Sequence, residues 1–416
     1  MPKPNNPKTK SRPRRKRMPT LLPAIVLAFL LIPFFTSGST YYTEAEREST
    51  SMLLMQDTAE PEEQTRPSEY LDQLDVLAET EIEDFTDTLE GEEIEISDDS
   101  LDYEYEEEEE APYDLVTITI SAVGDMTLGG DPRGLNFFIR EFENNDQDHA
   151  HFLRYVSHIF QADDLTLANL EGTLTYATTH RDREFVFRGP PHFARILSSS
   201  GVDAVSIANN HTMDFYERGY RDTIASLVAE NIAYFGNDYT TIIEINGIKV
   251  GLFGLSIWSY SGYGNRIRAS IENLQERGAQ LIIAFYHWGI EGSNEPRANQ
   301  RRYGQFSIDH GAHLVLGAHP HVIQGIEEYN GWNIVYSLAN FSFGGNNHPA
   351  DQDTFIFQQT FTFQDGVLLE TNDTNIIPAL ISSERERNNF QPIVAEGEDV
   401  ERILDRIARY SEALNR

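Results

Sequence analysis

The sequence has no cysteine among its 416 residues. That absence excludes disulfide frameworks, thiolate metal sites, cysteine nucleophiles and lipid attachment through cysteine. Basic residues are also scarce, since 32 Lys and Arg stand against 67 Asp and Glu and give a net charge of −35. Nucleic-acid binding depends on clustered Lys and Arg that neutralise phosphates, so we expect no nucleic acid as a partner.

The basic residues are concentrated at the start of the chain. Residues 1–17 hold eight Lys and Arg, and an uncharged apolar run follows at residues 21–35. A basic flank before an apolar run is the layout of a secretory signal or a signal-anchor. The sequence after the run fits a cleavage site only loosely, so we favour an uncleaved membrane anchor at residues 19–38, with residues 1–18 as a cytoplasmic tail. A cleaved signal, which would leave the protein secreted, is the alternative. Both interpretations put the rest of the chain outside the cell.

The acidic residues are concentrated in the next part of the chain. Residues 40–114 carry 29 Asp and Glu but only two Arg. High net charge with few apolar residues cannot offset the entropy of ordering, so we predict a disordered acidic linker at residues 39–114. A less favoured alternative is that the run of glutamates at 106–110 mimics or repels an acidic ligand.

The remainder of the chain alternates strand-like and helix-like segments. Short β-branched apolar runs occupy residues 115–123, 165–168, 203–208, 281–285, 313–316 and 333–338, and helix-like stretches occupy residues 192–199, 221–230 and 271–277. Such alternation predicts an α/β domain with a largely parallel sheet, which we assign to residues 115–385. Residues 386–416 form a C-terminal segment with a helix near residues 400–414.

Polar side chains follow the ends of these predicted strands. Because the carboxyl ends of strands in an open α/β sheet converge, we expect these side chains to lie together. Oxygen and imidazole ligands without sulfur suit Mn, Fe or Zn better than Ca. Six candidates exceed one tetrahedral site and suggest two divalent ions, with one carboxylate bridging them. The candidate ligands are Asp125, Glu171, Asn210, His287, His319 and His321.

Two local features refine this candidate site. His319 and His321 are two residues apart, and Pro320 biases the segment away from helix, so an extended backbone would point both imidazoles at one site. His211 follows the candidate ligand Asn210 and is placed to act as a general acid for a leaving group. Two ions a few ångströms apart would clamp a phosphoryl oxygen and activate a water molecule.

Structural alternatives exist for several of these residues. Asn209, Asn210 and His211 also fit a helix N-cap cluster, because Asn is a preferred cap residue. His287 also fits a packed core histidine. Arg188 precedes Gly189-Pro190-Pro191 and fits a loop entering a helix; it also fits a contact to an anionic substrate group.

Seven motifs occur in a characteristic order between residues 117 and 345. They are Gly124-Asp125-Met126, Asn169-Leu170-Glu171, Phe187-Arg188-Gly189-Pro190-Pro191, Ala208-Asn209-Asn210-His211-Thr212-Met213-Asp214, His287-Trp288-Gly289, Gly317-Ala318-His319-Pro320-His321 and Tyr336-Ser337-Leu338-Ala339-Asn340-Phe341. This series resembles the CapA family of poly-γ-glutamate capsule biosynthesis proteins, relatives of calcineurin-like metallophosphoesterases.

The resemblance implies a fold, a set of ligands and a set of partners. It implies a four-layer αββα sandwich of the metallophosphoesterase type, metal ligation at the six positions above, and an acid or phosphate-contacting role for His211. Arg188, Asn209 and Asn340 become candidate substrate-binding residues. Implied partners are the membrane, poly-γ-glutamate, and a polymer synthesis complex with CapB- and CapC-like members. Thr127 departs from the pattern, because metallophosphoesterases typically have a histidine two residues after the first aspartate.

The function predicted from these features is a membrane-anchored, extracellular component of poly-γ-glutamate synthesis or export with a metallophosphoesterase-like metal site. One alternative is a two-metal phosphoesterase that acts on an extracellular phosphate ester. Another is a metal-dependent γ-glutamyl hydrolase that cleaves the polymer itself.

Overall fold

The computed structural model describes residues 114–369 and 373–414. The predicted cytoplasmic tail and membrane anchor lie outside the described residues, as does the predicted acidic linker up to residue 113. Within the described part of the chain, no helix combines the length and the apolar character that crossing a membrane requires.

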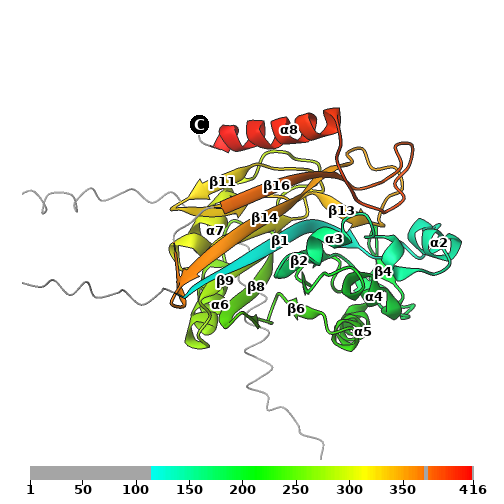
Figure 1. Ribbon diagram of the computed structural model, residues 1–416. Coiled ribbons are helices and arrows are strands. Elements are labelled where there is room, and N and C mark those ends of the chain that lie inside the picture. Colours follow the sequence, from blue (N-terminus) through cyan, green and yellow to red (C-terminus); the bar gives the residue numbers. More distant parts are fainter. Residues whose placement is uncertain (1–113, 370–372, 415–416) are drawn as a thin grey trace, which may run out of the picture. The chain divides into compact units, whose positions relative to one another are not determined.

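The fold contains two large mixed sheets (Figure 1). The family resemblance implied two sheets, whereas the alternation of strands and helices predicted a largely parallel sheet. The first sheet has the order β17-β16-β14-β1-β2-β5-β6, with β13 also paired to β1 and β15 to β14. Its centre is parallel, and β14, β16 and β17 add an antiparallel side. Its strands are β1 (Leu115–Thr127), β2 (Leu165–Leu170), β5 (Ala204–Ser206), β6 (Ala233–Phe235), β13 (Asn340–Phe343), β14 (Asp353–Gln364), β15 (Val367–Leu368), β16 (Asp373–Leu380) and β17 (Ile393–Val394).

The second sheet follows the same plan. Its order is β11-β12-β10-β9-β8-β7, with a parallel centre and an antiparallel strand at each edge. Its strands are β7 (Thr241–Ile245), β8 (Ile248–Ile257), β9 (Leu281–Trp288), β10 (Leu314–Ala318), β11 (Ile326–Tyr329) and β12 (Trp332–Val335). A separate short parallel pair joins β3 (Thr173–Leu174) to β4 (Arg188–Gly189).

Three apolar cores define the layers. Ile118 and Leu167 of the first sheet pack with Ile283 and Leu316 of the second, so the two sheets lie face to face. The outer face of the first sheet packs on helices α2 (Phe137–Asn144), α3 (Ser157–Phe160), α4 (Ala194–Ser198) and α5 (Tyr216–Ala229), with the short 3-10 helices η1 (His149–His151) and η2 (Pro191–Phe193) nearby. The outer face of the second packs on α6 (Gly264–Glu276) and α7 (Ala298–Asp309). The order is helices, sheet, sheet, helices.

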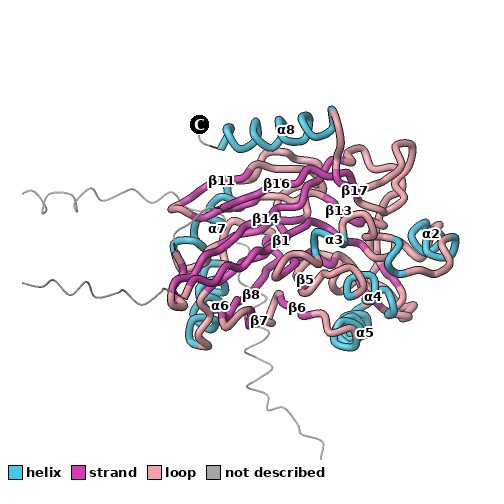
Figure 2. Tube along the Cα trace, in the orientation of Figure 1, coloured by secondary structure: helices cyan, strands magenta, loops and turns pink. Residues whose placement is uncertain are grey.

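Helix α8 (Glu398–Leu414) runs beside β16 and β11 and adds Ile403 and Ile407 to the core between the sheets (Figure 2). Arginines of the helix form salt bridges with aspartates at the start of β14. Arg406 donates to Asp351 at 2.6 Å, and Arg402 donates to Asp353 at 3.2 Å. Asp399 in turn accepts from Arg385 and Arg402.

Strands β1 and β9 extend further than their apolar runs predicted, whereas β5 and β12 end two and three residues earlier. Strand β1 continues through Asp125, and β9 includes His287. The pairing of β1 with β2 shifts register between Ala122 and Asp125. An irregularity of this kind changes the direction in which the neighbouring side chains point. Gly124 permits the close approach of a neighbouring chain segment, because a Cβ there would lie 1.8 Å from the carbonyl oxygen of Ala339. The sequence predicted that β1 and β9 end at the polar residues, although the backbone ladder continues through them.

Candidate metal centre

All six predicted ligands lie in one buried cluster where strands of both sheets end. Asp125 comes from β1, His287 from β9, and Glu171 directly follows β2. Asn210 comes from the loop after β5, while His319 and His321 come from the loop after β10. The parallel centres of the two sheets therefore bring these residues together, as expected for strand ends in α/β folds.

Glu171 is the central residue of this cluster. Its side chain is 1% exposed, and Oε2 accepts a hydrogen bond of 3.3 Å from Thr127. Its other oxygen, Oε1, has no hydrogen-bond partner among the described residues. That oxygen faces the Nε2 atoms of His287 at 3.7 Å, His211 at 3.9 Å and His321 at 4.0 Å. These separations are too long for hydrogen bonds.

Asp125 is fully buried and uses both of its oxygens. Oδ1 accepts from the Asn169 amide at 2.7 Å, and Oδ2 accepts from the backbone N–H of His319 at 3.0 Å. The Nδ1 atoms of His321 and His287 lie 3.2 Å and 3.8 Å from the carboxylate. Asp125 therefore fixes residues from β2, β9 and the loop after β10 around one point.

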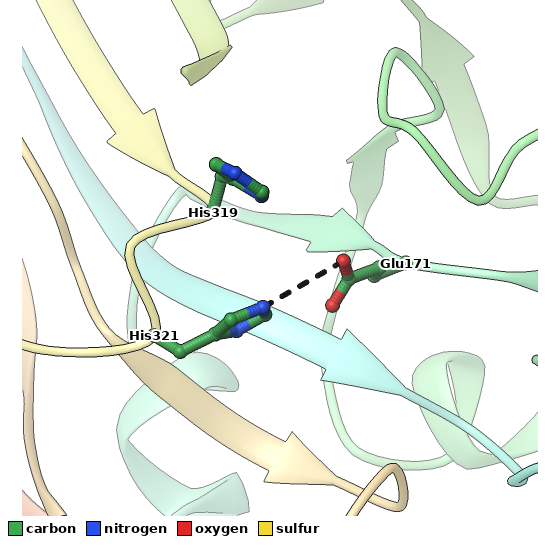
Figure 3. Close-up of side chains that lie close together, drawn as sticks. All are labelled: Glu171, His319 and His321. Carbon is green, nitrogen blue, oxygen red and sulfur yellow. Dashed lines mark ion pairs between the residues drawn. The ribbon is translucent and has the colours of Figure 1, made fainter. Parts of the chain in front are cut away.

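His319 and His321 converge on Glu171, as Figure 3 shows, but the extended backbone predicted for them is wrong. Both histidines have positive φ, +93° for His319 and +58° for His321. One potential ligand atom from each of Glu171, His319 and His321 lies within 4.8 Å of the other two. Left-handed backbone at non-glycine residues is strained and concentrates at functional sites. The two imidazoles therefore meet through a sharply turned loop.

The two histidines have opposite electrostatic environments. Burial opposes a proton on His321, but Glu171 and Asp125 outweigh burial and raise the pKa of His321 to about 10. Burial lowers the pKa of His319 to about 4, and its Nδ1 has no hydrogen-bond partner among the described residues. Burial likewise holds the pKa of His287 well below its usual range.

The two carboxylates also differ. Burial raises the pKa of Glu171 to about 7, with His321 opposing this change and Asp125 adding to it. Burial also opposes ionisation of Asp125, but its contacts with His321 prevail and lower its pKa to about 2. Asp125 is thus a fixed negative charge, while Glu171 exchanges its proton near neutral pH.

His211 has its own carboxylate partner. Its Nδ1 lies 2.7 Å from Oδ2 of Asp214, and its Nε2 points towards Glu171. Asp214 is fully buried and also accepts from the backbone N–H of Phe187 at 2.6 Å and from Arg183 at 3.1 Å. A carboxylate on one ring nitrogen fixes the orientation of the other, so His211 is held facing the centre.

The polar loop residues predicted as ligand or substrate contacts have structural partners. The amide oxygen of Asn210 lies 2.8 Å from Nε2 of His287. Asn209 donates to the carbonyl of Leu170 at 2.8 Å and accepts from the N–H of His211 at 3.1 Å. The N-cap alternative for this loop is wrong, because α5 begins at Tyr216 with Phe215 at its N-cap.

The other two predicted substrate contacts are also engaged. Oδ1 of Asn340 lies 2.9 Å from Nδ1 of His321, so this residue orients a candidate ligand. The guanidinium of Arg188 hydrogen-bonds to the carbonyl of Ala177 and lies 5.3 Å from the ring centroid of Phe215. The contacts of Arg188 are thus structural, although Arg188 lies in strand β4 and not in the predicted loop, and the helix that follows starts with Pro191 at its first turn.

The donor set fits a divalent metal ion. Two atoms that bind one ion at about 2.0–2.2 Å stand at most about 4.4 Å apart, which matches the spacing between Glu171 Oε1 and the histidine nitrogens. Glu171 Oε1 and His319 Nδ1 are buried polar atoms without a hydrogen-bond partner in the described part of the chain, and an ion would satisfy them. Carboxylate, amide and imidazole donors suit Zn, Mn or Fe. A divalent ion is therefore compatible with this cluster.

Sequence reasoning missed three residues of the centre. Asn169 links Asp125 to His287, since its amide nitrogen lies 2.7 Å from one and 3.3 Å from the other. Asp214 holds His211. Trp258 lies edge-on to His319, with 4.8 Å between ring centroids. Asn169 and Asp214 occur within the seven motifs, and their position near a predicted ligand was the signal available.

Comparison with known proteins gives the following matches. Residues 119–345 match the family model described as bacterial capsule synthesis protein PGA_cap. The chain is 27% identical over 248 residues to the PGA biosynthesis protein CapA of Bacillus subtilis (strain 168), covering 54% of this chain and 63% of that protein. It is 23% identical over 253 residues to the capsule biosynthesis protein CapA of Bacillus anthracis, covering 54% of this chain and 60% of that protein. The chain thus spans less than two thirds of either relative.

A solved structure gives a weaker match. The crystal structure of TT1561 of Thermus thermophilus is 12% identical with a TM-score of 0.37, covering 58% of this chain and 94% of that one. A likeness of this size carries no argument.

Proposed function

The chain belongs to the bacterial capsule synthesis protein PGA_cap family, as its motif series predicted, and on that premise we propose that it serves in poly-γ-glutamate synthesis or export at the cell membrane. Residues 19–38 anchor it, residues 1–18 lie in the cytoplasm and the metal-binding domain lies outside. Its partners are the growing polymer and a synthesis complex with CapB- and CapC-like members. The names of the two Bacillus relatives support the pathway.

One observation carries the metal-dependent part of this proposal. A buried carboxylate oxygen of Glu171 faces three imidazole nitrogens at 3.7–4.0 Å and has no hydrogen-bond partner among the described residues. A buried, unpaired carboxylate is costly, and a cation that binds it together with the imidazoles of His287 and His321 removes that cost. Asp125, Glu171, Asn210, His287, His319 and His321 are the residues that would hold one or two ions, in a fold of the metallophosphoesterase type.

The chemistry available at this centre depends on both the ion and the protein. A bound divalent ion supplies charge that stabilises a developing oxyanion. Asp125 keeps His321 and His319 in place through a 3.2 Å contact and a 3.0 Å hydrogen bond. Asp214 orients His211 so that its Nε2 faces the centre, where a proton can pass to or from a substrate oxygen or nitrogen.

The pairing of His211 with Asp214 favours a second candidate function. In it the protein is a metal-dependent hydrolase that acts on a phosphate ester or on the γ-glutamyl amide, with His211 as the acid. His211→Ala should abolish turnover of p-nitrophenyl phosphate or of γ-linked glutamate oligomers and leave bound metal unchanged. Equal turnover in the wild type and in the variant would remove this candidate.

Metal content of the full-length protein tests the metal-dependent part directly. Mass spectrometry should find one or two equivalents of Mn, Fe or Zn in the wild type and a loss in the double variant His319→Ala/His321→Ala. The matched control is His158→Ala/His348→Ala, which removes two exposed histidines outside the cluster and should keep the metal. Absence of metal from the wild type after incubation with Mn and Zn salts would overturn the metal centre.

The capsule part of the proposal needs a cellular measurement. Deletion of the gene in its own bacterium should abolish surface γ-linked polyglutamate, and the wild-type gene should restore it. Restoration by the His319→Ala/His321→Ala gene would separate the capsule role from the metal centre. An unchanged polymer level in the deletion strain would contradict the capsule role itself.

A further inference from the structure

Trp258 is an exposed aromatic residue that borders the metal centre. It follows the last residue of β8, and its ring centroid lies 4.8 Å from that of His319 at an interplanar angle of 87°. The ring of His287 is 5.8 Å away. Although it touches two buried histidines, Trp258 is 45% exposed. A large apolar surface left in water beside a candidate metal centre is a contact available to a ligand.

The loop that carries Trp258 is fixed through its backbone. The Tyr303 hydroxyl and Arg302 on α7 donate to the carbonyl of Tyr260 at 2.9 Å and 3.3 Å. The backbone N–H of Trp258 donates to the Tyr263 hydroxyl at 3.2 Å. The loop is therefore held in place while the indole remains exposed. A contact that is already in position loses little conformational entropy when a ligand binds.

A second exposed aromatic residue, Phe185, is connected to a different histidine of the centre through the buried ring of Phe187. Phe187 lies 4.3 Å from the ring of His211, and Phe185 stacks on Phe187 at 6.5 Å and 16°. Phe185 is 53% exposed. One exposed ring thus lies against His319, and another lies one ring away from His211. This placement suits a ligand that extends beyond the metal-bound group in more than one direction.

We propose that Trp258 is a specificity-determining residue that packs against the substrate chain next to the group held at the metal centre, with Phe185 contacting a neighbouring segment of the same chain. The substrate class is an extended chain of planar amides and methylene groups, since both pack well on aromatic faces. γ-Linked glutamate has both features. This inference rests on the proposed function and adds how the same site selects its substrate.

The test compares three variants of the full-length, Mn-loaded protein by isothermal titration calorimetry with a γ-linked glutamate decamer. Trp258→Ala should weaken decamer binding about tenfold, the size expected for loss of one aromatic contact. Trp258→Phe should retain affinity within about threefold. The matched control is Tyr260→Ala in the same loop, because Tyr260 is 58% exposed and its ring contacts Arg302. It should bind the decamer as the wild type does.

Metal binding provides the second readout. All three variants should bind Mn with wild-type affinity, because Trp258 contacts the imidazole faces and supplies no ligand atom. Loss of Mn binding in Trp258→Ala would overturn the inference and make Trp258 a shield for His319. Equal decamer affinity in Trp258→Ala and the wild type would overturn it while leaving the proposed function intact. A wild type that binds Mn but no decamer would overturn both this inference and the polymer as ligand.

Discussion

Two groups of acidic residues in this molecule differ in the partners that they have. Near α8, Asp351, Asp353 and Asp399 pair with three arginines, and Arg406 donates to Asp351 at 2.6 Å. At the metal centre, Asp125 and Glu171 face imidazoles, and Glu171 Oε1 has no hydrogen bond among the described residues.

This difference in partners identifies the cluster that is suited to bind a cation. Arginine is always charged and presents several donors, so the α8 cluster is satisfied by the chain itself. An imidazole can bind a metal ion through a ring nitrogen that carries no proton, and here the imidazoles leave Glu171 Oε1 without a hydrogen bond among the described residues. The α8 cluster is thus architectural, whereas the Glu171 cluster suits a metal ion.

Glu171→Gln should have a large effect on the metal centre. We expect metal affinity to fall by at least about 100-fold, because the loss of partners one shell further out already costs 10–100-fold. The metal-free variant should be no less stable than the wild type above pH 7. The amide keeps the acceptor for Thr127, 3.3 Å away, and removes a buried charge. Metal titration and thermal melts in EDTA measure the two effects.

Glu141→Gln is the matched control. Glu141 is also buried beside a histidine, with His151 at 3.4 Å, but Arg387 pairs with its other oxygen at 3.2 Å. This variant should lose stability and keep metal affinity. Equal effects of the two substitutions on metal affinity and stability would mean that Glu171 is no more a metal ligand than Glu141 is.

The centre was more predictable from the sequence than the α8 cluster. Asp125, Glu171 and His287 were identifiable because each lies in or directly after an apolar β-branched run, and parallel strand ends converge. The positive φ of His319 and His321 was not predictable, because it depends on tertiary contacts such as the hydrogen bond from His319 N–H to Asp125. The pairs of Asp351 and Asp353 with Arg402 and Arg406 join residues about 50 positions apart, which no local pattern reveals.

Metal binding at the Glu171 cluster should depend on pH. Without metal, His321 has a pKa of about 10 and Glu171 of about 7, both above their usual ranges, so both hold protons that a metal ion must displace. Affinity should therefore rise with pH, by about tenfold per unit between pH 7 and 9 for the single proton of His321. Titrations with Zn or Mn at several pH values measure this slope.

The stability of the metal-free fold should change with pH in the direction opposite to metal affinity. A raised histidine pKa stabilises the metal-free fold below pH 6.5, and this contribution is lost as pH rises towards 10. The metal-induced increase in melting temperature should therefore grow between pH 7 and 9. A flat affinity profile over that range would contradict a protonated His321 in the metal-free centre.

The smallest expected effect comes from the satisfied cluster, through Asp353→Asn. Asp353 accepts from both Arg402 and Arg406, so this variant should lose about 1–2 kcal/mol of unfolding free energy. The loss stays modest because Arg402 is 45% exposed and Arg406 retains Asp351. Metal affinity should not change.

The control is Arg221→Ala, which breaks a pair whose members are 72% and 58% exposed. It should lower the unfolding free energy by less than about 0.5 kcal/mol. Denaturant unfolding in EDTA measures both variants. A loss of metal from Asp353→Asn would show that the arginine-paired cluster supports the centre, and the division between an architectural and a metal-binding cluster would fail.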